Sequence, residues 1–171
     1  MSQTLSEWQP NFEQLLYANQ GMVFGLALHF LRDRTAAEEI AQDVFLALHK
    51  HLRSVTSEEH ARYWLRRVTA QRCIDYARRR PAISVPLDDV REMGSDSPLN
   101  DVFLRARLRK LIATLAPEAR AAMLLRYQED LSPPEIAATL CRPLATVKSH
   151  LQRSLALLRE KMSRSGSVVN E

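Results

Sequence analysis

The sequence predicts an all-α protein of two small helical domains joined by a flexible acidic linker. Apolar residues recur at three- and four-residue spacing, sustained strand alternation is absent from the pattern, and only four glycines occur among 171 residues. Residues 1–80 and 102–171 carry net charges of +2 and +6, whereas residues 81–101 carry −4. Because this acidic stretch is also rich in Pro, Ser and Asp, we interpret it as a linker. We therefore expect domains at 1–80 and 102–162, a linker at 81–101 and a disordered tail at 163–171.

The first domain is predicted to hold three or four helices. Apolar residues between Phe12 and Leu31 indicate one long helix or two short ones. A following helix is expected to begin at Thr35, because Glu38 stands three residues later, the spacing of a capping box. The polar side of this helix carries acidic and amide groups, and its default interpretation is a solvated helix face.

A third segment, which ends in three arginines and a proline, is unusually basic and aromatic. Seven arginines lie between Arg62 and Arg80, interleaved with Tyr63 and Tyr76. Cations suit a nucleic-acid backbone and flat side chains suit unstacked bases, so the pattern favours contact with a single strand. Trp64 lies on the apolar stripe and is expected in the core. The alternative is that the arginines at the helix end only complement its dipole.

Two further helices joined by a tight turn are predicted within residues 131–158. Ser132 and Glu135 have capping-box spacing, and Pro133 falls at the first helical position. The second helix carries an apolar stripe over residues 144–158 and an opposite face of small, amide and cationic side chains. That arrangement suits a helix placed in the major groove of DNA. A capped helical hairpin with a solvated polar face explains these residues equally well.

Membrane, metal and catalytic functions are disfavoured by the sequence. The longest apolar run, residues 21–31, is shorter than the roughly 20 residues of a membrane span. The polar N-terminal stretch lacks the basic start of a signal peptide, so we expect a cytoplasmic protein. Cys73 and Cys141 belong to no Cys-x-x-Cys pair, so we expect no zinc site, disulfide framework or cofactor. We expect no enzyme activity, because the sequence offers no Gly-rich phosphate loop and no nucleophile–base pair.

Three segments of the chain carry a resemblance when they are taken together: AEEIAQDVFLALHKHL, YWLRRVTAQRCIDYARRR and LSPPEIAATLCRPLATVKSHLQRSLALLREKM. The first resembles region 2.2, the second regions 2.3 and 2.4, and the third region 4.2 of one protein family. That family is the extracytoplasmic function (ECF) group of bacterial sigma-70 RNA polymerase sigma factors. The segments occur in the family's order and lie within residues 11–162. The resemblance implies a region 2 domain followed by a region 4 domain with a helix-turn-helix.

The resemblance also implies binding roles for three groups of residues. The contacts to the clamp helices of the polymerase β′ subunit would be Glu39, Gln42, Asp43 and Leu46. The contacts to the −10 non-template strand would be Gln71, Arg72, Asp75, Arg78 and Arg79. The contacts to the −35 duplex would be Lys148, Ser149, Gln152 and Arg153. The loop around Ser54 to Glu59 would receive a flipped base of the −10 element.

From the resemblance we expect a protein that binds core RNA polymerase and directs promoter-specific initiation. Its partners would be the β′ clamp helices and β flap of core polymerase, promoter DNA and an anti-sigma factor, without membrane insertion. One alternative is a stand-alone helix-turn-helix transcriptional regulator that binds duplex DNA without polymerase. Another is a helical protein-interaction module whose arginines are only solvated.

Three positions depart from the family pattern. Gln71 stands where Asn is usual, and its extra methylene changes the reach toward a −10 base. Cys141 and Ala145 stand where Gly is usual. A left-handed conformation at Cys141 would cost on the order of 1 kcal/mol. We expect Cys141 to be a small buried apolar side chain rather than a redox sensor.

Overall fold

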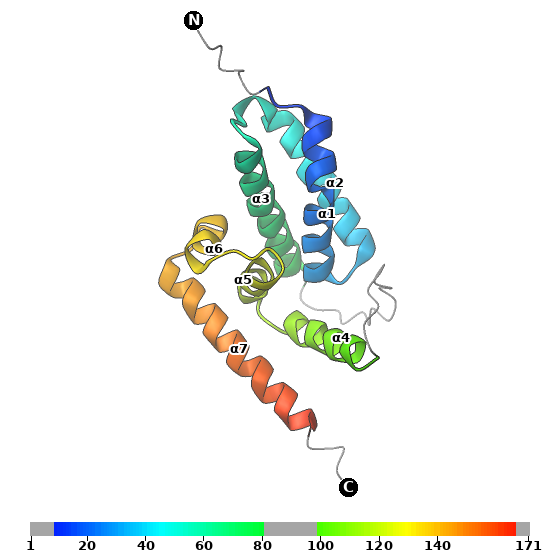
Figure 1. Cartoon of the computed structure of the whole chain (residues 1–171), viewed down its shortest axis with the longest axis vertical. Helices are drawn as coiled ribbons and strands as arrows, with labels where there is room; N and C mark the ends of the chain where they lie inside the picture. Colours follow the sequence, from blue (N-terminus) through cyan, green and yellow to red (C-terminus); the bar gives the residue numbers. More distant parts are fainter. Residues whose placement is uncertain (1–8, 81–98, 167–171) are drawn as a thin grey trace, which may run out of the picture.

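The protein is described by a computed structural model over residues 9–80 and 99–166, which form seven α-helices and one short 3-10 helix (Figure 1). No strand occurs in these two ranges, so the all-α prediction is confirmed for them. Helices α1 to α3 form one group and α4 to α7 a second, with α5 and α6 packed against α3 (Figure 1). Most of the predicted linker, residues 81–98, and the end of the predicted tail, residues 167–171, lie outside the described residues.

The N-terminal group packs three long helices around one apolar core. Its elements are α1 (Phe12–Leu31), α2 (Arg34–His51), the 3-10 helix η1 (Leu52–Ser54) and α3 (Glu58–Arg79). The first apolar stretch is therefore one continuous helix. The largest fully buried side chains of this group are Leu26, Phe30, Leu48 and Leu65.

The start of α2 differs from the prediction. The cap is Asp33 rather than Thr35, since the Asp33 carboxylate accepts a hydrogen bond at 3.1 Å from the backbone N–H three residues later. The expected capping box does not form at Thr35, which lies inside α2, and Glu38 accepts a hydrogen bond from the Arg34 side chain at 2.9 Å. The cause lies in α1, which ends on a left-handed Arg32 (φ 56°) and so leaves Asp33 directly before α2.

The C-terminal group contains α4 (Leu99–Ala113), α5 (Pro117–Tyr127), α6 (Pro133–Leu140) and α7 (Leu144–Gly166). Helix α4 begins inside the last three residues of the predicted linker, and α7 extends four residues into the predicted tail. Proline favours a helix start, and α4 begins directly after Pro98 in the sequence. No proline interrupts α7, which ends at a glycine.

Helix α6 combines a confirmed prediction at its start with a corrected one at its end. The capping box forms, because the Glu135 carboxylate accepts from the Ser132 N–H at 2.7 Å and from its hydroxyl at 2.6 Å. Helix α6 then ends on Cys141 in the left-handed conformation (φ 52°, ψ 48°). The expectation that Cys141 is buried is wrong, since its side chain is exposed. The apolar residues of these two helices that are fully buried in the core are instead Ile136 and Val147.

The two groups share a packed boundary. The Arg120 guanidinium of α5 donates hydrogen bonds to the carbonyls of Phe30 (3.0 Å), Ala113 (2.5 Å) and Leu115 (3.1 Å). It also lies 5.0 Å from the centroid of the Phe30 ring. One cation thus joins the C-terminal end of α1, where the helix dipole is negative, to the turn between α4 and α5. The described parts of the chain therefore adopt a closed arrangement.

Candidate polymerase and nucleic-acid interfaces

The four residues predicted to bind polymerase share one exposed face of α2. Helical spacing of three, four and seven residues places Gln42, Asp43 and Leu46 on the same side as Glu39, and all four are exposed. Leu46 is 61% exposed and stands among polar neighbours. This face lies opposite the side of α2 that fills the core, so a partner can reach it in the closed arrangement.

An ion pair connects this face to α3. The Arg72 guanidinium lies 3.2 Å from the Asp43 carboxylate, and the two side chains are 38% and 61% exposed. Pairs this exposed typically contribute 0–1 kcal/mol, so the contact orients the side chains more than it stabilises the fold. Arg72 consequently points toward α2, where it joins a predicted −10 contact to a predicted polymerase contact.

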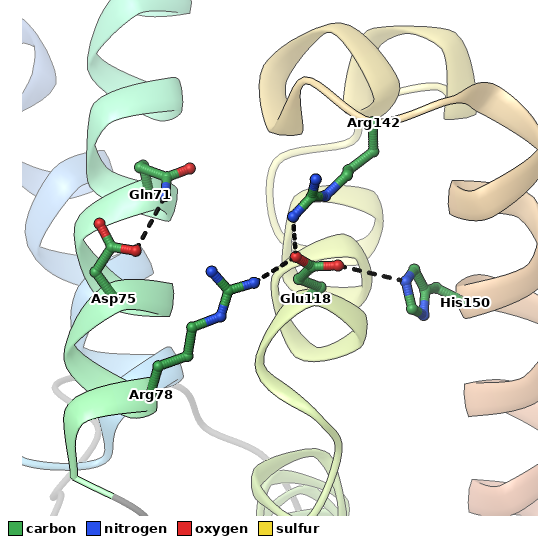
Figure 2. Close-up of polar contacts among 6 residues, drawn as sticks. All are labelled: Gln71, Asp75, Arg78, Glu118, Arg142 and His150. Carbon is green, nitrogen blue, oxygen red and sulfur yellow. Dashed lines mark hydrogen bonds and ion pairs between the residues drawn. The ribbon is translucent and has the colours of Figure 1, made fainter.

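The five predicted −10 residues fall into two rows on α3. Gln71, Asp75 and Arg78 follow one another along one side of the helix, and the Gln71 side-chain amide donates to the Asp75 carboxylate at 3.1 Å (Figure 2). Arg72 and Arg79 lie seven residues apart on a neighbouring side. Arg78 of the first row reaches toward α5 of the second group (Figure 2).

The aromatic residues of α3 are only partly in the core. Trp64 is half-buried, and its ring stacks on His51 with a 5.1 Å centroid separation and an interplanar angle of 14°. It therefore packs at the edge of the core rather than inside it. The Tyr63 hydroxyl donates to a backbone carbonyl of α6 at 3.1 Å. The Arg80 guanidinium lies 5.1 Å from the centroid of the Tyr76 ring and donates to its hydroxyl at 2.8 Å.

The loop predicted to receive a flipped base is short and anchored. Val55 is 4% exposed and fixes the middle of the loop to the core. Ser57 caps α3, and its hydroxyl oxygen accepts from the His60 N–H at 3.0 Å. The Thr56 N–H donates to the His60 ring at 3.2 Å. Thr56 and Ser54 remain exposed on the outer side of this loop.

The predicted −35 face lies at the surface of α7. Lys148, Gln152 and Arg153 are exposed and Ser149 is half-buried, while the apolar stripe behind them faces α5 and α6. One stripe member differs from the pattern: Leu144, the first residue of α7, is 38% exposed. The four predicted contacts are therefore brought together on one side of the helix, as their spacing indicated.

Two family models match the chain, one in each group of helices. Sigma-70 region 2 matches residues 15–82, and Sigma-70, region 4 matches residues 105–158. The RNA polymerase sigma-E factor of Streptomyces coelicolor is 29% identical over 151 residues, which cover 88% of this chain and 85% of that protein. The ECF RNA polymerase sigma factor SigE of Mycolicibacterium smegmatis is 30% identical over 92% of this chain and 64% of its own length. The chain belongs to the sigma-70 family, in its ECF group.

Two solved structures share the fold of this chain over most of its length. The sigma factor RpoE in its complex with the anti-sigma factor NepR from Bartonella quintana matches with a TM-score of 0.70 and 19% identity, over 94% of this chain and 98% of that one. CnrH in its complex with the cytosolic domain of CnrY matches with a TM-score of 0.65 and 21% identity, over 90% and 88% of the two chains.

A cluster of charged side chains at the start of α5 in this sigma factor was not predicted from the sequence. The Glu118 carboxylate accepts hydrogen bonds from Arg78 at 2.5 Å and from Arg142, and it faces His150 at 3.9 Å (Figure 2). The hydrogen bond from Arg142 and the charges of its cationic neighbours lower the pKa of Glu118. In the sequence Glu118 is only an acid beside Pro117 at a helix start, where the dipole alone explains it.

Two structural features are absent from the described parts of this sigma factor. Residues 9–80 and 99–166 contain no cluster of three His, Cys, Asp or Glu side chains with the geometry to hold a metal ion. Among the helices described, none has the length and apolar character needed to cross a membrane.

Proposed function

We propose that this sigma factor binds core RNA polymerase and directs promoter-specific initiation, reading duplex −35 DNA with α7 and the melted −10 strand with α3. The observation that carries the proposal is the presence of three separate surface faces on one sigma-70 family chain. One lies on α2, one on α3 and one on α7. Each face has the side-chain chemistry that its proposed partner requires.

The polymerase contact is assigned to the α2 face. Its acidic and amide groups, Glu39, Gln42 and Asp43, offer hydrogen-bond acceptors to cationic partners, and Leu46 offers one apolar anchor. Interfaces commonly combine a buried apolar anchor with a polar rim. We assign this face to the β′ clamp helices, and the C-terminal domain to the β flap.

The −10 contact is assigned to α3 and to the loop before it. Arginines there meet phosphates, and the amide of Gln71 offers both a donor and an acceptor to a base edge. The loop around Ser54 to Glu59 would hold a flipped base. Capturing a base in this way stabilises the opened strand and offsets an unpairing cost of a few kcal/mol.

The −35 contact is assigned to the exposed face of α7. Lys148 and Arg153 carry the charge that phosphates or guanine edges require, while Ser149 and Gln152 offer hydrogen bonds to bases. Two weak DNA contacts joined through one chain and one polymerase gain avidity over either contact alone. The chain by itself should consequently bind promoter DNA poorly.

We also propose that a protein of the anti-sigma type regulates this chain in the cytoplasm. Support comes from the likeness of both domains to RpoE and CnrH, whose solved structures are complexes with NepR and with the cytosolic domain of CnrY. The α2 face, being exposed and partly apolar, is the surface such a partner would cover in competition with polymerase.

The test is run-off transcription from genomic promoter fragments with core polymerase and the purified chain. Products with discrete starts that appear only when both components are present support the proposal. A chain that binds duplex promoter DNA tightly by itself, and yields no promoter-specific product with core polymerase, is instead a stand-alone regulator.

Two variants separate the DNA contact from the polymerase contact. Arg153→Ala should reduce −35-dependent initiation about tenfold or more, as expected for one lost base or phosphate contact, while core binding is retained. Asp43→Ala should weaken core binding. The matched controls Arg159→Ala and Glu13→Ala remove equivalent exposed charges from α7 and α1. An equal loss of core binding in both test variants contradicts this division of roles.

A further inference from the structure

The side-chain amide of Gln71 on α3 is bound by a carboxylate one helical turn away. Its Nε2 group donates a hydrogen bond to Oδ1 of Asp75 at 3.1 Å (Figure 2). The two residues are four positions apart, the spacing at which side chains of one helix meet. Because both partners belong to α3, the bond does not depend on where the second group of helices lies.

The chemistry of the two groups decides which end of the amide faces Asp75. An ionised carboxylate only accepts hydrogen bonds, whereas an amide has a donor end and an acceptor end. Turning the amide over would place its oxygen beside a carboxylate oxygen, with no hydrogen between them. The Gln71 oxygen therefore points away from Asp75, as Figure 2 shows. The guanidinium of Arg78, three residues further along, is directed to Glu118 instead.

The two residues differ in how far a ligand can reach them. Gln71 is exposed at the surface of α3, whereas Asp75 is half-buried. With one N–H bound to Asp75, the amide still offers its oxygen and its second N–H to a ligand. These two groups lie side by side, and the bond to Asp75 fixes their order. Asp75 can thus act on a ligand through Gln71 without contacting it.

A fixed order of acceptor and donor divides the four DNA bases into two classes. Adenine and cytosine carry an exocyclic amino donor next to a ring-nitrogen acceptor on their Watson–Crick edge. Guanine and thymine carry a carbonyl acceptor next to a ring N–H. A base that has left the stack is read by hydrogen bonds to this edge. The exocyclic group projects furthest from the ring, so it meets the outward oxygen of Gln71, which accepts from an amino group but not from a carbonyl.

We propose that Asp75 is a positioning residue that orients Gln71 to read an amino base, adenine or cytosine, in the melted −10 strand. This inference rests on the proposed function and adds to it the class of base that is read. The alternative is a hydrogen bond that only stabilises α3. Loss of a merely stabilising bond would leave the base preference unchanged, so the preference is the quantity to measure.

The first test is transcription by core polymerase with this chain from a pool of promoter fragments. The pool derives from a promoter found by run-off transcription, with its −10 region randomised and a barcode in the transcribed part. At one −10 position adenine or cytosine should be preferred to guanine or thymine about tenfold or more. Gln71→Ala should abolish that preference and thereby identify the position. A preference for guanine or thymine there, or no position affected by Gln71→Ala, overturns the proposal.

Asp75→Asn tests the positioning role at the position so identified. An asparagine amide can donate or accept, so Gln71 can bind it in either orientation. The preference should fall about tenfold, to near equality, while preferences at other positions are retained. Asp75→Glu keeps a group that only accepts and should keep the amino bases preferred. An unchanged preference in Asp75→Asn overturns the positioning role.

The matched control is Glu160→Gln on α7. Glu160 forms an ion pair at 2.8 Å with Arg164, which also stands four residues away on the same helix. The variant therefore removes a carboxylate and weakens a contact of the same spacing, far along the chain from α3. It should change no base preference. A change equal to that of Asp75→Asn would show a general effect of lost charge and overturn the positioning role.

Nuclear magnetic resonance of the 15N-labelled free chain tests the orientation without transcription. The side-chain amide signals of Gln71 are those that Gln71→Ala lacks. One of its two protons should be shifted downfield by the bond to the carboxylate, and Asp75→Ala should lose that shift. Equal signals in both proteins overturn the fixed orientation. If the shift is present but no promoter-specific transcript forms, the proposed function is rejected; transcripts with the same preference in wild type and Asp75→Asn reject only the positioning role.

Discussion

The turn between α6 and α7 holds a cysteine in a backbone conformation that glycine adopts without strain, so Cys141→Gly is expected to stabilise the C-terminal domain. The residue has φ 52° and ψ 48°, in the left-handed region. Its side chain is exposed, and its sulfur makes only a 3.7 Å contact with the Ala138 carbonyl. The backbone N–H of residue 141, which donates to the same carbonyl at 3.3 Å, is retained in the glycine variant.

The expected magnitude is the difference between two opposing terms. A left-handed conformation costs an L-residue about 1–2 kcal/mol, and glycine removes that cost. Glycine also gains about 0.4–1 kcal/mol of additional freedom in the unfolded chain, which favours unfolding. At the midpoints of these ranges the net result is an increase of about 0.8 kcal/mol in the free energy of unfolding. For a chain of this size that corresponds to a Tm higher by about 1–4 °C.

Urea unfolding followed by circular dichroism measures this difference directly. The matched control is Cys141→Ala, which removes the sulfur but keeps the Cβ atom and therefore the strain. Its free energy of unfolding should stay within about 0.5 kcal/mol of the wild-type value. A glycine variant no more stable than the alanine variant would show that the left-handed turn is not strained at this position.

Three further predictions concern buried or paired groups. Iodoacetamide should alkylate Cys141 but not Cys73 in the folded protein, because burial raises the pKa of the Cys73 thiol to about 12. Mass spectrometry of the digested protein identifies which cysteine has been alkylated. The pKa of Glu118 is lowered from its ordinary value of 4.5, chiefly by the hydrogen bond from Arg142. The contribution of ionised Glu118 to the free energy of unfolding should therefore be complete above pH 4.5 and lost as the pH falls through the lowered pKa. Urea unfolding at a series of pH values measures this, and Glu118→Gln should remove that part of the pH dependence. Arg120→Met should lower the free energy of unfolding by about 2–4 kcal/mol, because three backbone carbonyls lose their charged hydrogen-bond donor. A loss below about 1 kcal/mol in urea unfolding would contradict the stabilising role of Arg120.

Structural features that depend on residues close together in the sequence were predicted correctly. The capping box of Ser132 and Glu135 forms as expected, since both members lie within one turn. The start of α2 was predicted wrongly because two residues with capping side chains, Asp33 and Thr35, stand close together. The choice between them depends on where α1 ends, at Arg32, which is a property of the neighbouring helix.

Exposure was harder to predict than helix position. Cys141 was expected inside and lies at the surface, because the left-handed turn places the apolar contact on neighbouring residues. Leu144 fits the apolar stripe of α7 by spacing, yet it precedes the part of the helix that faces α5 and α6. Periodicity identifies a side of a helix, but where a second helix covers that side depends on packing.

By itself the sequence determined the helical content, the faces of α2, α3 and α7, and the resemblance to ECF sigma factors. The helical content and the faces depend on spacings of three, four and seven residues within single helices, so they are visible without neighbouring helices. The resemblance depends instead on the order of residues within three segments of the chain. Only the tertiary structure decided that Glu118 and Glu129 form ion pairs with arginines of α3. Their partners on α3 are 40 and 63 residues away in the chain, and an ion pair over such separations leaves no periodic trace in the sequence.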